Sequence, residues 1–113
     1  MSRLNLIRIQ ELKDLDDDGS NETLKQLINL YYANTEKLIN ELANEYKSKN
    51  WPKVKQLSNS IRASSLNIGA DQVVEAARKL EYAEADGIEK IGTEKLITSF
   101  GMAKNDLRIY LLT

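Results

Sequence analysis

The stretch NSIRASSLNIGA, residues 59–70, decides the fold because it gives one helix a buried side and an outward side. With Ile61 placed at the centre of the buried side and 100° per residue, the residues within about 60° of it are Val54, Leu57, Ser58, Ser65 and Ile68. Asn59 falls at about 160°, on the opposite side. The spacing therefore predicts a helix that packs on one side, ends or bends at Gly69, and exposes Asn59.

The outward side of this helix is unusual for a solvent-exposed surface because it is small and partly apolar around Asn59. Ala63 comes one turn after Asn59 and leaves room for another protein to approach, and Leu66 adds an exposed apolar contact. Arg62 lies at the edge of this side. We expect a partner-docking surface made of Lys55, Gln56, Asn59, Arg62, Ala63 and Leu66.

Apolar residues recur at three- and four-residue steps on both sides of this stretch, and no segment alternates as a strand would. The pattern predicts helices over residues 4–15, 22–49, 51–68, 71–85 and 94–112, with a short connection between the last two. Ser20 or Asn21 is expected to cap the second helix, and Pro52 to lie in the first turn of the third. We predict an all-α fold and a single domain over residues 1–113: an antiparallel up-down four-helix bundle with a short additional N-terminal helix.

Composition narrows the possible functions, because the 113 residues include no Cys and no His. A disulfide framework, a thiol nucleophile and every His-based catalytic site are thereby excluded. We therefore expect no catalytic residue, no cofactor and no enzymatic activity. Sixteen basic and seventeen acidic residues give a net charge of −1, which favours neither nucleic acid nor an anionic membrane. We expect a monomeric cytoplasmic protein with no nucleic-acid or membrane partner.

Charge is distributed unevenly along the chain. Residues 47–70 contain no Asp or Glu but include Lys47, Lys49, Lys53, Lys55 and Arg62, so this segment carries +5 and the remainder −6. A local basic face suggests a partner with an acidic patch. The alternative is a solvated surface on which the charges cluster by chance.

One motif resembles a calcium-binding loop. Asp14, Asp16 and Asp18, followed by Gly19, match the opening of an EF-hand loop, but its twelfth position, which needs a bidentate Glu, is Lys25. We expect no metal site here. An acidic connection leading into the positive N-terminal end of the next helix is the preferred interpretation, with weak calcium binding as the alternative.

Residues 59–70 resemble the signature of histidine-containing phosphotransfer (Hpt) domains, His-x-Leu-Lys-Gly-Ser-Ser-x-x-x-Gly-Ala. Similar residues to those of the family also occur at Tyr31 and Leu38, at Asn50-Trp51 and at Leu80-Glu81. The resemblance implies a four-helix bundle that relays phosphoryl groups in two-component signalling. In that family an exposed His exchanges a phosphoryl group with an Asp in the receiver domain of a response regulator or hybrid sensor kinase.

The chain departs from that signature at its reactive position. Arg62 keeps a cation where the family has Lys, Ala63 keeps a small residue, and the structural part of the motif remains in Ser64, Ser65, Gly69 and Ala70. Asn59, however, stands at the position of the His, and a carboxamide has no nucleophilic ring nitrogen.

We therefore expect a pseudo-Hpt protein that docks receiver domains without carrying phosphate, as a binding module or competitive inhibitor of a phosphorelay. Two alternatives stay open. The chain is an active phosphotransfer protein with an engineered His-to-Asn substitution at position 59, or it is a helical adaptor for a partner other than a receiver.

Overall fold

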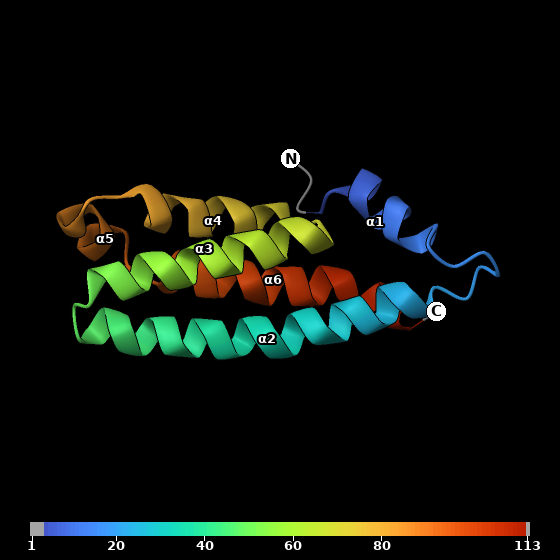
Figure 1. The fold of residues 1–113 in the computed structure, drawn as a ribbon, viewed down its shortest axis with the longest axis horizontal. Coiled ribbons are helices and arrows are strands. Elements are labelled where there is room, and N and C mark those ends of the chain that lie inside the picture. Colours follow the sequence, from blue (N-terminus) through green and yellow to red (C-terminus); the bar gives the residue numbers. More distant parts are fainter. Residues whose placement is uncertain (1–3, 113) are drawn as a thin grey trace.

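The computed structural model describes residues 4–112, which form six helices and no strand. In chain order they are α1 (Leu6–Lys13), α2 (Glu22–Lys47), α3 (Trp51–Ile68), α4 (Asp71–Tyr82), α5 (Ala85–Ile91) and α6 (Glu94–Leu111). Figure 1 shows α2, α3, α4 and α6 running lengthwise in one bundle, with α1 extending past one end and α5 at the other. The predicted all-α bundle is confirmed. No helix within the described range is long and apolar enough to cross a membrane.

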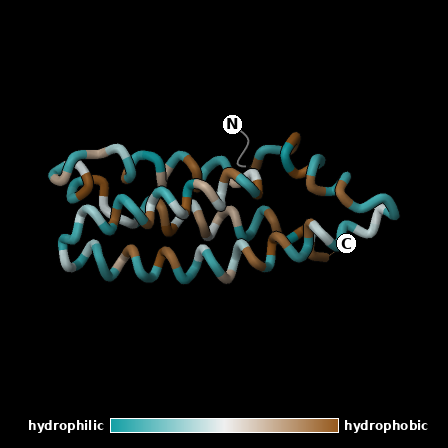
Figure 2. The backbone as a smooth tube through the Cα atoms, in the orientation of Figure 1, coloured by the Kyte–Doolittle hydropathy of each residue, from teal (hydrophilic) through white to brown (hydrophobic). Residues whose placement is uncertain are grey.

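The core of the bundle consists of the apolar stripes of its long helices (Figure 2). On α3 the buried residues are Val54, Leu57, Ser58, Ile61, Ser65 and Ile68, the same six that the helical spacing predicts. Each fully buried Leu or Ile stabilises the fold by roughly 1.5–3 kcal/mol relative to an exposed one. The burial pattern fixes the rotation of α3 about its axis, and so fixes which residues it turns outward.

A buried hydrogen bond between Tyr31 of α2 and Ser65 of α3 adds specificity to this packing. The Tyr31 hydroxyl and Ser65 Oγ lie 2.8 Å apart. The Tyr31 ring meets Phe100 of α6 edge to face, with 5.7 Å between ring centroids. Burial raises the pKa of Tyr31 to about 12, with the Ser65 hydrogen bond opposing that rise, so the hydroxyl is neutral. Three helices are thereby held in one register.

Two predicted boundaries in the C-terminal half are wrong. The helix expected over residues 71–85 ends at Tyr82, because Ala83 is extended, with φ −79° and ψ 152°. The segment expected to be a connection forms α5 instead. Asp86-Gly87 resembles a turn in sequence, but an acidic residue is also favoured in the first turn of a helix, and the buried Ile88 anchors α5 to the bundle.

The N-terminal cap of α2 also differs from the prediction. Asn21 makes no side-chain cap bond, and Ser20 Oγ accepts only a long bond, 3.4 Å, from the Glu22 amide. Asp16 takes the capping role from within the α1–α2 connection. Its Oδ2 accepts a hydrogen bond from the Thr23 amide, and its Oδ1 one from Thr23 Oγ1, both at 2.7 Å. The acidic connection thus stabilises a helix end, as the preferred interpretation of that motif expects.

Gly69 ends α3, and its carbonyl also accepts a hydrogen bond from the residue that precedes α1. Its φ of +83° is the left-handed conformation that glycine adopts at little cost. The Asn5 amide donates to the Gly69 carbonyl at 2.8 Å, and Arg8 Nε donates to the Asn67 carbonyl at 2.8 Å. These two bonds, which we call the α1 latch, join α1 to the end of α3.

Replacing Gly69 by alanine should destabilise the protein by about 1–3 kcal/mol in urea unfolding. The new Cβ would be strained by the positive φ and would lie 3.1 Å from the Asn5 carbonyl oxygen. Gly101→Ala in α6 is the matched control, because a Cβ there meets nothing within 4 Å. That variant should be unchanged or more stable by about 0.5–1 kcal/mol. Equal stabilities of the two variants would contradict this account.

Candidate functional site

The outward side of α3 forms the surface that we call the docking face, made of the six residues predicted for it. Gln56, Asn59, Ala63 and Leu66 are exposed, and Lys55 and Arg62 are partly buried at its edge. Leu66 is 55% exposed, which is high for a large apolar side chain. The orientation predicted for α3 is confirmed, and the docking role of this face stays a prediction.

Asn59 belongs to a hydrogen-bonded cluster with Arg62 and with Glu81 of α4. Asn59 Nδ2 donates to Glu81 Oε1 at 2.6 Å. Arg62 Nε donates to Glu81 Oε2 at 2.5 Å, and Arg62 Nη2 donates to Oε1 at 3.3 Å. Because the amide nitrogen of Asn59 faces Glu81, its amide oxygen is directed away from the carboxylate.

The electrostatics of this cluster follow from the bidentate ion pair. Only 13% of the Glu81 side chain and 25% of the Arg62 side chain are exposed. The Arg62 guanidinium holds the pKa of the Glu81 carboxyl below its usual range; burial opposes this effect, and the Asn59 amide adds to it. The charge of Arg62 is therefore balanced within the protein, next to the position where the Hpt signature has its His.

The depressed pKa of Glu81 makes part of the stability dependent on pH. A carboxyl whose pKa is lower when folded contributes its full stability above its unfolded pKa, ordinarily 4.5, and loses it as the pH falls through the folded pKa. Glu81→Gln should therefore be less stable than the wild type at neutral pH. As the pH falls through the folded pKa the difference should shrink, since the protonated Glu81 then resembles Gln. Urea unfolding of both proteins over a series of falling pH values checks this, and a constant difference would contradict it.

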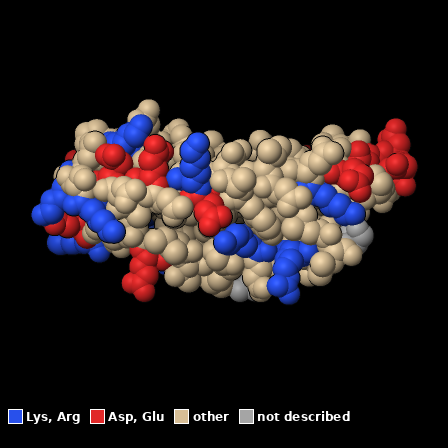
Figure 3. Space-filling view, turned by 90° about the horizontal axis from the view of Figure 1, so that it is seen from below, with Lys and Arg blue, Asp and Glu red and all other residues tan. Residues whose placement is uncertain are grey.

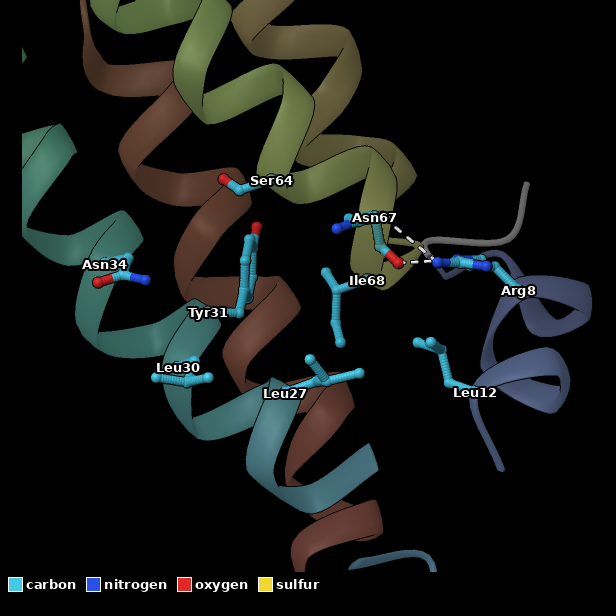
Figure 4. Close-up of a pocket in the computed structure, with 9 residues that line it drawn as sticks. All are labelled: Arg8, Leu12, Leu27, Leu30, Tyr31, Asn34, Ser64, Asn67 and Ile68. Atoms are coloured by element: carbon cyan, nitrogen blue, oxygen red, sulfur yellow. Dashed lines mark hydrogen bonds between the residues drawn. The ribbon is translucent and has the colours of Figure 1, made fainter. Parts of the chain in front are cut away.

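A cavity of about 160 Å³ lies beside the docking face, where α1, α2 and α3 meet. Figure 4 shows Leu12, Leu27, Tyr31 and Ile68 around it, with Arg8 hydrogen-bonded to Asn67 at one side. The nine lining residues are Arg8, Leu12, Leu27, Leu30, Tyr31, Asn34, Ser64, Asn67 and Ile68.

Of these nine lining residues only Ser64 belongs to the predicted site, and the eight others include Arg8, Leu30 and Asn34. These three come from α1 and α2, and their approach to α3 depends on tertiary packing that the spacing within one helix does not reveal. Leu30 could have been found from the sequence, because it is a large apolar residue that lies off the buried stripe of α2. In the structure its side chain is 57% exposed.

Acidic side chains lie near several of the basic residues between 47 and 70 in the folded chain, although that segment itself contains no acidic residue. Figure 3 shows acidic side chains gathered at the end that holds the α1–α2 connection, and basic side chains mixed with acidic ones at the opposite end. Of the basic residues between 47 and 70, Arg62 pairs with Glu81 and Lys49 with Glu89 of α5, the latter at 3.4 Å. Within residues 4–112, no three acidic side chains form a group that could hold a metal ion.

Comparison with known proteins identifies the fold. No family model and no curated protein matches the sequence. Among solved structures, the chain is similar to a crystal structure of a histidine-containing phosphotransfer protein from Medicago truncatula, with a TM-score of 0.82 and 19% sequence identity. The match covers 96% of this chain and 76% of that chain. The chain has the fold of a histidine-containing phosphotransfer protein.

Proposed function

We propose that this chain is a phosphorelay protein that docks receiver domains of response regulators or hybrid sensor kinases but accepts no phosphate. The observation that carries the proposal is the position of Asn59. It lies exposed at the centre of the docking face in a bundle with the Hpt fold, where the resembling signature has a His. This role would place the chain in the cytoplasm, without a cofactor and without enzymatic activity of its own.

The chemistry of Asn59 explains why docking would occur without transfer. In transfer from a receiver, a ring nitrogen lone pair attacks phosphorus, a N–P bond forms, and the bond from phosphorus to the Asp oxygen breaks. The lone pair of the Asn59 amide nitrogen is delocalised into its carbonyl, so this nitrogen cannot act as the nucleophile. Its two N–H groups can only donate hydrogen bonds. The nitrogen is also engaged with Glu81 at 2.6 Å. No step of the transfer can therefore take place on Asn59.

The shape and polarity of the docking face support binding of a protein partner. Ala63 is exposed and small, so another backbone can approach the helix closely at its centre. Leu66, and Leu30 beside the neighbouring cavity, present apolar surface that water solvates poorly. An apolar centre with polar residues at its rim is typical of protein–protein interfaces. A receiver held here would be withheld from an active Hpt protein, which makes the chain a competitive inhibitor of the relay.

The test combines a binding and a transfer measurement. Calorimetry with a panel of receiver domains should show saturable binding to at least one, while incubation with the same receiver, phosphorylated, should leave no acid-labile phosphate on the chain. Added to an active Hpt protein and that receiver, the chain should slow transfer in proportion to receiver occupancy. Absence of binding to every receiver, together with partner contacts that map to α1 and α6, would favour the adaptor alternative. A His codon at position 59 of the native gene would favour the engineered alternative.

A further inference from the structure

We propose that the cluster of Asn59, Arg62 and Glu81 makes the docking face indifferent to phosphorylation of its receiver. The chain would then bind the phosphorylated and unphosphorylated forms of one receiver with similar affinity. This inference rests on the proposed function and concerns the regulation of the same face.

The first argument is the charge balance at the point where a phosphoryl group would arrive. The cation nearest to Asn59 in the cluster is Arg62, and two of its nitrogens donate to the Glu81 carboxylate. A phosphoryl group next to Asn59 would therefore meet, at Arg62, an ion pair of zero net charge rather than an unpaired guanidinium. Both members are largely withdrawn from solvent, at 25% and 13% exposure, so the pair is weakly screened and its geometry is well defined.

The second argument is the direction of the Asn59 amide. Its nitrogen donates to Glu81 Oε1 at 2.6 Å, and the atom directed away from Glu81 is the amide oxygen, an acceptor. Phosphoryl oxygens are acceptors as well at neutral pH, so the two cannot form a hydrogen bond. The ion pair therefore offers a phosphorylated receiver no net charge, and the outward amide oxygen offers it no hydrogen bond; the Nδ2 hydrogen that Glu81 does not bind is the one donor left on the Asn59 side chain.

Lys55 is the other cation of the docking face, one turn before Asn59. Its charge also acts on the Glu81 carboxylate. A partly buried lysine on a flexible stem at the edge of the face contributes little energy to any one contact and mainly steers the encounter. It should therefore affect the association rate more than the ratio of the two dissociation constants.

The decisive variant is Glu81→Gln, which keeps the shape of the cluster but leaves the Arg62 charge unbalanced. Glu75→Gln is the matched control, since it removes the same charge from the same helix where Glu75 pairs with Arg78 at an exposed position. Each protein is titrated with a receiver that binds the wild type, both unmodified and activated with beryllofluoride, a mimic of the aspartyl phosphate. The measured quantity is the ratio of the two dissociation constants.

For the wild type and Glu75→Gln we expect the ratio to stay within about threefold of unity, and for Glu81→Gln we expect about a tenfold gain in favour of the activated receiver. A wild type that prefers the activated receiver by more than about tenfold would overturn the inference. So would a ratio that Glu81→Gln leaves unchanged.

A second measurement separates this inference from the proposed function. Inorganic phosphate is titrated into the free proteins while the backbone amide resonances of Asn59 and Arg62 are followed by NMR. Saturable shifts in Glu81→Gln at millimolar phosphate, without such shifts in the wild type, support the charge argument. Saturable shifts in the wild type, or none in either protein, overturn it. If no receiver binds, the proposed function fails, and this titration alone decides the inference.

Discussion

Asn59→His is expected to become labelled with acid-labile phosphate when incubated with a phosphorylated receiver, whereas the wild type remains unlabelled. The surroundings of position 59 are suited to a histidine. Glu81 Oε1 lies 2.6 Å from Asn59 Nδ2, close to where the Nδ1–H of an imidazole would donate. That bond would leave Nε2 unprotonated and directed outward as the nucleophile. The Arg62 guanidinium lies within the same cluster.

The measurement is phosphate transfer from a radiolabelled receiver, analysed for stability in acid and in alkali. Asn59→Gln is the control for a change of side chain without a ring nitrogen, and it should remain unlabelled. Adding Glu81→Ala to the histidine variant should slow labelling by about tenfold or more, because the imidazole loses the partner that orients it and selects its tautomer. A histidine variant that binds its receiver with wild-type affinity yet stays unlabelled would contradict this account of the site.

Ala63→Arg is expected to weaken receiver binding by at least about thirtyfold, or about 2 kcal/mol. Ala63 is exposed at the centre of the docking face, one turn from Asn59. A long charged side chain there would prevent close approach of the partner and would have to be desolvated in the interface. Calorimetry measures the loss, and far-ultraviolet circular dichroism establishes that the bundle remains folded.

Ala33→Arg is the matched control for that variant. Ala33 is also an exposed alanine within a helix, two residues after the buried Tyr31 and so on the far side of α2 from the core. The same substitution there should leave receiver affinity within about twofold of the wild type. Equal losses in both variants would indicate a general effect of the added charge, and no loss in Ala63→Arg would exclude the outward side of α3 as the docking face.

The sequence predicted the fold and the orientation of α3 well, because both depend on apolar spacing within single helices. All six residues expected on the buried side of α3 are buried, and Asn59 is exposed. The end of α3 was also predictable, since Gly69 is the residue type that the left-handed terminal conformation requires. In these cases the local preference and the tertiary structure agree.

Features that depend on contacts between distant segments were not predictable in the same way. Asp16 caps α2 from seven residues away, in place of the adjacent Ser20 or Asn21. The helix α5 depends on burial of Ile88 against the bundle, which no local signal reveals. The ion pair of Arg62 with Glu81 joins α3 to α4, so the basic run in the sequence overstates the net charge of the docking face.

The α1 latch has a consequence for the order in which the chain folds. It joins Arg8 to Asn67, which is 59 residues further along the chain and lies at the end of α3. This contact can form only after α3 has formed. The segment synthesised early can therefore reach its final position only late, after α2 and α3 have paired and Gly69 has adopted its left-handed conformation. For the same reason α1 should be the first helix to detach in the native state. Its amides should exchange with deuterium faster than those of the bundle that it closes.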